Sequence, residues 1–136
     1  MRRPRPGAPG SGQHRVKRAI LLVDHGSRRA EANAQLGALA ERVRLRRPEV
    51  VVELAHLELV EPTLTQGIEA CVEAGAEEIA VVPYFLGPGR HTQEDIPRQI
   101  DDARARHPGV VFRIGEPLGL HDRLIDALLE RADEAS

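Results

Sequence analysis

Short apolar runs rich in β-branched residues alternate with longer segments of helical period from Ala19 onward. The runs lie at Ala19–Val23, Val50–Leu54, Ile79–Val82 and Val110–Ile114. A strand that is covered on both faces has no polar side, so it appears as a continuous apolar run and not as an alternating one. The four runs therefore predict four buried strands.

Apolar residues between and after these runs recur at the spacing of one helix face. Breakers stand at the expected ends: Ser27 can cap the first helix, Pro48 follows it, Gly75 ends the second, and Pro108-Gly109 closes the third. Strands separated by helices predict an α/β fold with a four-stranded parallel sheet and helices on both faces. The four stripes are Leu36, Leu39, Ala40 and Val43; Leu64, Ile68, Cys71 and Val72; Ile96, Ile100 and Ala103; and Leu124, Ile125, Leu128 and Leu129.

The first 18 residues differ from the rest in composition. They hold six basic residues, no acidic one, and many prolines and glycines. Such a segment cannot bury apolar area, so residues 1–18 are expected to be a disordered tail and residues 19–136 a single domain. Because the whole chain has a net charge of −2, residues 19–136 carry −8, which argues against a nucleic-acid-binding domain.

Cysteine content and hydropathy indicate the compartment. A single cysteine, Cys71, excludes an internal disulfide framework and sites built on several thiolates. No apolar stretch approaches the roughly 20 residues that span a bilayer, and the amino terminus lacks the apolar core of a secretory signal. We expect a cytoplasmic protein that does not enter a membrane.

Two histidines and a glutamate follow predicted strands. His25 comes after the first strand, Glu58 after the second, and His91 after the third. In parallel sheets, functional groups gather at the carboxyl ends of the strands, where the strand order reverses; with the order 2-1-3-4, His25 and His91 flank that point. A helix amino end keeps a nearby imidazole neutral, which suits Co, Ni, Fe or Zn. Spacing alone does not separate a metal site from acid–base chemistry.

Three segments carry a family resemblance: LLVDHGSR, HLELVEPTL and VVPYFLGPGRHTQEDIP. They resemble the short sirohydrochlorin chelatases of cobalamin and siroheme synthesis, and the likeness runs from about Ile20 to Leu129. It implies half of a class II chelatase fold, often dimeric, with His25, His91 and Glu58 as metal-binding and catalytic residues. One departure is His56, where the family usually has an aromatic residue.

The implied reaction suits these groups. Inserting Co²⁺, Fe²⁺ or Ni²⁺ into a tetrapyrrole requires the ion to lose water and two pyrrolic protons to leave. Neutral imidazoles and a carboxylate can hold the ion and accept the protons. No cofactor is expected beyond the divalent metal substrate.

Several residues at the same edge could contact an acidic, planar tetrapyrrole. Arginines and a helix amino end can bind its carboxylates, although each arginine could equally be solvated helix surface. Tyr84 and Phe85 are the aromatic pair placed to stack on the ring, and the glycines beside Pro88 suit either a mobile lid or a simple turn. The expected substrate-contacting residues are Ser27, Arg28, Arg29, Tyr84, Phe85, Gly89 and Arg90.

Two other functions use the same histidines. A histidine phosphatase would need an arginine beside its nucleophile, but Asp24 stands there and would repel phosphate. A metal-carrying or metal-sensing module would bind the ion without catalysing insertion. For the chelatase a homodimer is expected, because one sheet edge offers only one wall to a macrocycle.

Overall fold

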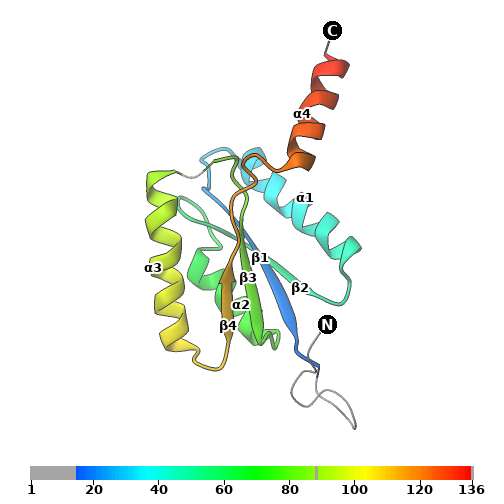
Figure 1. Ribbon diagram of the computed structural model, residues 1–136. Coiled ribbons are helices and arrows are strands. Elements are labelled where there is room, and N and C mark those ends of the chain that lie inside the picture. The colour runs from blue at the N-terminus through cyan, green and yellow to red at the C-terminus, as the bar shows by residue number, and fades with distance from the viewer. Residues whose placement is uncertain (1–14, 88, 136) are drawn as a thin grey trace.

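The computed structural model describes residues 15–87 and 89–135, and within them the side chains of residues 90–93 are not described. Four strands and four helices alternate along the chain (Figure 1). None of the described helices is both long and apolar enough to cross a membrane. The elements are β1 (Arg18–Asp24), α1 (Ala30–Arg46), β2 (Val51–His56), α2 (Leu64–Glu73), β3 (Glu78–Pro83), α3 (Arg90–Arg106), β4 (Val111–Ile114) and α4 (Asp122–Glu134).

The strands form one parallel sheet, as the sequence predicted, and their order is β2-β1-β3-β4. The chain first adds β2 on one side of β1 and then crosses to add β3 on the other side. The strand order therefore reverses between β1 and β3. Loops that follow these two strands meet at the carboxyl edge of the sheet, where ligand sites of such folds are built.

Two apolar clusters cover the two faces of the sheet, with α2 and α3 on one side and α1 on the other (Figure 1). Ile68 and Ile100 pack with Leu21 on the first face, while Leu36 and Ala40 pack against Leu22 and Val52 on the second. The apolar stripes predicted for the first three helices are thus buried. Burying them holds the strand ends, and the loops attached to them, in fixed positions.

Strand β1 and its pairing begin slightly before the boundary at residue 19 that composition suggested. Residues 1–14 of the predicted tail lie outside the described part of the chain. The Lys17 N–H donates to Glu77 Oε1 at 3.0 Å, and the Lys17 carbonyl accepts from the Glu77 N–H at 2.8 Å. Arg18 already belongs to β1. Backbone pairing therefore holds residues that composition alone had placed in the tail.

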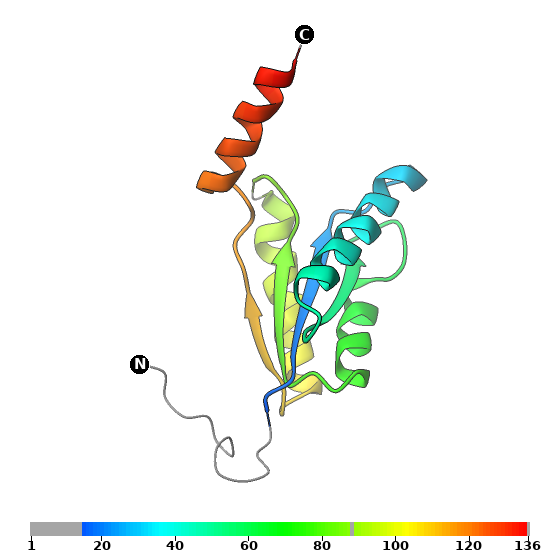
Figure 2. The same ribbon diagram turned by 90° about the vertical axis from the view of Figure 1, so that its right-hand side faces the viewer.

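Helix α4 does not pack as its sequence pattern predicted. Its apolar stripe exists, but no residue of the helix is buried, and Leu128 is 64% exposed. The helix projects from the body beyond the carboxyl edge of the sheet (Figures 1 and 2). On the α1 side of the sheet, no described helix packs closely on β4, where Arg113 and Val111 are exposed. One chain thus leaves both a helix face and a strand face uncovered.

Cys71 lies in the core of the α2 face and is fully buried. Burial, with a smaller contribution from the nearby Glu53 carboxylate, raises the pKa of the thiol to about 12. Because only the thiolate is nucleophilic, we expect native Cys71 to react with an aromatic disulfide reagent at pH 8 roughly 1,000-fold more slowly than it does in denaturant. A colorimetric thiol titration measures this, with Cys71→Ala as the blank. Stoichiometric native labelling within seconds would contradict the buried position.

Candidate active site

The loops that follow β1 and β2 run side by side and carry His25 and Glu58. The Leu57 N–H donates to the Asp24 carbonyl at 2.9 Å, and the Glu58 N–H donates to the His25 carbonyl at 3.0 Å. These bonds extend the pairing of β1 with β2 by two residues beyond the strands. The sheet register therefore brings together a histidine and a glutamate that are 33 positions apart in the sequence.

Gly26 is required where these two loops touch. Its φ is +89°, a conformation that side chains rarely adopt, and a Cβ atom there would lie 1.9 Å from the Glu58 carbonyl oxygen. Only a residue without a side chain allows this approach. The glycine of the DHGS segment thus sets the distance between the two loops.

The exposed His25 ring lies on Phe85, with ring centroids 4.2 Å apart and an angle of 31° between the planes. Phe85 itself is 6% exposed and belongs to the core on the α2 face. This position contradicts the expectation that Phe85 stacks on a macrocycle: its ring supports His25 instead. Alternation along the chain sends the neighbouring Tyr84 to the α1 face, where it is half-buried.

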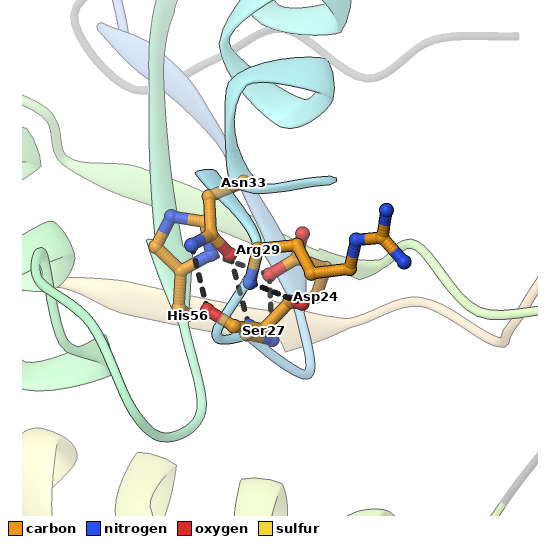
Figure 3. Close-up of polar contacts among 6 residues, drawn as sticks. Asp24, Ser27, Arg29, Asn33 and His56 are labelled. Atoms are coloured by element: carbon orange, nitrogen blue, oxygen red, sulfur yellow. Dashed lines mark hydrogen bonds and ion pairs between the residues drawn. The ribbon is translucent and has the colours of Figure 1, made fainter. Parts of the chain in front are cut away.

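The sequence suggested that Ser27 caps α1, and this was wrong: Ser27 is held by α1 but is not its cap residue. The cap residue is Arg29, whose side chain accepts no hydrogen bond, and the Ser27 hydroxyl accepts the Arg29 N–H at 3.0 Å (Figure 3). The side chain of Asn33 makes two hydrogen bonds to the backbone of Ser27: its Oδ1 accepts the Ser27 N–H at 2.9 Å, and its Nδ2 donates to the Ser27 carbonyl at 2.7 Å. Sequence reasoning missed Asn33, since an asparagine one turn into a helix gives no signal of a loop contact.

A buried polar pair lies beneath these loops. His56 Nδ1 and Asp24 Oδ1 are 2.5 Å apart, and the side chains are 4% and 18% exposed (Figure 3). The same Asp24 oxygen accepts the Gly26 N–H at 3.1 Å. From the sequence, Asp24 was interpreted only as a residue that repels anions, and its pairing with His56 was not predicted.

A cleft of about 230 Å³ opens beside these residues. It lies between the end of β1, the first turns of α1 and Tyr84. A larger hollow of about 320 Å³ lies at the amino edge of the sheet, around Arg18 and Arg113, on the far side from His25. Of these two hollows, the smaller adjoins the point where the strand order reverses. Its lining residues are Asp24, His25, Gly26, Ser27, Ala32, Gln35, Leu36 and Tyr84.

Comparison with known proteins agrees with this geometry. Residues 19–135 match the model of the CbiX family. The chain belongs to the CbiX family. It is 42% identical over 118 residues to the sirohydrochlorin ferrochelatase of Priestia megaterium, covering 87% of this chain and 44% of that protein. It is 33% identical over 140 aligned positions to the sirohydrochlorin cobaltochelatase of Methanococcus maripaludis, covering 85% of this chain and 97% of that protein.

A solved structure shares the architecture of this CbiX chain. The sirohydrochlorin chelatase SirB from Bacillus subtilis subspecies spizizenii, in complex with cobalt, matches with a TM-score of 0.81 and 39% identity. The match covers 88% of this chain and 51% of SirB. The chain therefore spans about half the length of several relatives that it matches, and nearly the whole length of the Methanococcus protein.

The other predicted site residues of this CbiX chain lie at the same edge. Arg28 and Arg29 are exposed before α1, and Gly89 directly precedes α3. Arg90 and His91 belong to the first turn of α3, but their side chains are outside the described part. Among the described side chains, no three His, Cys, Asp or Glu residues gather to hold a metal ion. A ligand set that includes His91 therefore stays a prediction.

Proposed function

We propose that this protein inserts a divalent metal ion, Co²⁺, Fe²⁺ or Ni²⁺, into sirohydrochlorin. The observation that carries the proposal is the edge at which the strand order reverses, where His25 lies on Phe85 beside the backbone of Glu58. The names of its relatives support the same reaction, since they include both ferrochelatases and cobaltochelatases. The product serves siroheme or cobalamin synthesis.

The site residues divide the work of the reaction. His25 is exposed and its ring orientation is fixed by Phe85, so its imidazole can hold the incoming ion without a large loss of rotamer freedom. His91 is proposed as the second nitrogen ligand. Glu58 is proposed as a third ligand or as the acceptor of the pyrrolic protons. Two pyrrolic N–H protons leave as the ion enters, so the two positive charges of the ion replace those of the two protons and the net charge of the macrocycle does not change.

The surroundings of the cleft suit an acidic macrocycle. Arg28 and Arg29 are exposed at the amino end of α1, where the helix dipole also favours anions. We propose that they and Arg90 bind substrate carboxylates. Asn33 holds both backbone groups of Ser27, so Ser27 is proposed to contact the substrate by donating its hydroxyl proton. Gly89 is proposed to contact the substrate through its backbone, and Tyr84, which lines the cleft, through its ring.

A spectroscopic assay tests the function. Under anaerobic conditions, the purified protein is mixed with sirohydrochlorin and with Co²⁺, Fe²⁺ or Ni²⁺ in turn. The absorption bands of the macrocycle are then followed over time. We expect metallation faster than the spontaneous reaction for at least one metal, with rates that saturate in both substrates. A metal carrier would bind the ion and leave the rate unchanged, which would refute the proposal.

We further propose that the working unit is a homodimer in which α4 contacts the second copy. Ile125, Leu128 and Leu129 form an exposed apolar stripe, and α4 begins at the carboxyl edge beside the loop that follows β3. We propose that this stripe packs against the face of β4 of the second copy, where Val111 is exposed and no described helix packs closely. A twofold axis would bury both surfaces twice and place two clefts opposite each other, so that two walls enclose the macrocycle.

Replacing Leu128 by glutamate is expected to give a monomer, because the charge would have to be buried in the apolar contact. Light scattering at micromolar concentration should report about twice 14.9 kDa for the wild type and 14.9 kDa for the variant. Leu45→Glu is the matched control, since Leu45 is 82% exposed on α1. A dimer that survives Leu128→Glu would refute the role of α4.

The cytoplasmic location stays a prediction.

A further inference from the structure

We propose that Asp24 and His56 are positioning residues that fix the relative placement of the His25 and Glu58 loops, and with it the affinity of the site for the metal ion. This role rests on the proposed function. Neither side chain is assigned to hold the ion. The pair acts through the two loops to which it is joined, one residue before His25 and two residues before Glu58.

His56 closes the base of the loop that carries Glu58. The backbone N–H of His56 donates to the Pro62 carbonyl at 2.8 Å. The chain therefore leaves β2 at His56 and comes back to it at Pro62. Between these points the backbone turns through Leu59, which has a φ of +77°. The orientation of this loop relative to the sheet therefore depends on how His56 is held.

Asp24 holds both loops through a single oxygen atom. Its Oδ1 accepts the N–H of Gly26, in the turn that carries His25, and it also pairs with the ring of His56 (Figure 3). Because these side chains stand on adjacent strands in register, the pair adds a side-chain connection to the two backbone bonds of the loops. The side chain of His56 is buried and that of Asp24 is only 18% exposed, so water competes poorly for the pair.

The chemistry of the pair defines what a substitute must supply. A carboxylate oxygen can only accept a hydrogen bond, so the proton between the two residues is on His56 Nδ1. An asparagine amide can place an N–H near the position of Nδ1. A glutamine amide reaches the position of Nε2 instead. These two variants have the same functional group and differ in where they put the donor.

The test compares His56→Asn with His56→Gln. Calorimetry measures the Kd of each protein for Co²⁺ alone, and the assay measures KM for Co²⁺ and for sirohydrochlorin separately. We expect His56→Gln to weaken Co²⁺ binding and to raise the KM for Co²⁺ by roughly 10–100-fold, the usual effect of losing a residue that orients metal ligands. His56→Asn should restore both values toward those of the wild type. The KM for sirohydrochlorin should change little in either variant.

Several outcomes would overturn the role. A folded His56→Gln protein with wild-type Co²⁺ affinity would do so, as would equal losses in both variants, which would indicate packing of the ring and not its hydrogen bond. Adding His56→Gln to Asp24→Ala should cause little further loss, because the oxygen with which His56 pairs is already absent. If both His56 variants unfold, Asp24→Ala, which removes the oxygen that accepts from both loops, should weaken Co²⁺ binding, and unchanged binding would refute the proposal. A wild type that binds Co²⁺ without metallating sirohydrochlorin would refute the proposed function, while the Co²⁺ affinities would still decide the positioning role.

Discussion

His25→Ala and His91→Ala are each expected to lower the rate of metal insertion by at least about 100-fold. Mutating a residue that only orients a metal ligand already lowers metal affinity or activity by roughly 10–100-fold, and losing a ligand should have a larger effect. Each variant would remove one of the two proposed nitrogen ligands of the incoming ion. The His25 ring is exposed, so its removal leaves the core cluster on the α2 face in place and should change the melting temperature little. Initial rates with saturating sirohydrochlorin and varied Co²⁺ measure the effect.

A histidine at the opposite edge of the sheet provides the control. His107 lies between α3 and β4 and pairs with Glu69 at 2.8 Å, so His107→Ala should keep a wild-type rate per folded molecule. Glu58→Gln discriminates between its two proposed roles: a loss as large as that of His25→Ala marks a ligand, and a smaller loss marks a proton acceptor. Wild-type rates in His25→Ala would reject the assignment of the metal site.

Gly26→Ala is expected to reduce both the stability of the protein and its activity strongly. The new Cβ would stand 1.9 Å from the Glu58 carbonyl oxygen, and the backbone at φ +89° would be strained as well. The strain alone lowers the free energy of unfolding by about 2 kcal/mol, and relief of the clash separates the loops of His25 and Glu58. We expect metal insertion to fall below detection in the protein that still folds. Chemical denaturation and the absorption assay measure the two effects.

Gly37→Ala is the matched control. A Cβ at Gly37 meets no atom within 4 Å, and the residue lies inside α1. Alanine there should raise the free energy of unfolding by about 0.5–1 kcal/mol, because glycine weakens helix interiors. Equal behaviour of the two alanine variants would show that the contact at Gly26 does not constrain the loops.

Much of the architecture could be predicted from the sequence because it rests on local periodicity. Continuous apolar runs indicated the four strands, and the stripes at Leu36, Ile68 and Ile100 indicated three buried helix faces. The alternation of strands and helices then predicted a parallel sheet, and with it the edge where His25 and Glu58 lie together. These inferences need only the chemical type of each residue and its spacing along the chain.

The tertiary structure alone decided which side chains meet. Asp24 pairs with His56 across 32 positions because the register of β1 with β2 sets them opposite each other, and no local pattern encodes that register. Phe85 is buried beneath His25 because alternation after β3 turns it to the α2 face and Tyr84 to the α1 face.

Helix α4 shows the limit of periodicity most directly. Its stripe at Ile125, Leu128 and Leu129 predicted a buried face as clearly as the other three stripes did, yet this face is exposed. An apolar stripe determines that a helix has a side to bury. It does not determine which surface buries that side, because this depends on where the preceding segment directs the helix and on which faces of the sheet are already covered.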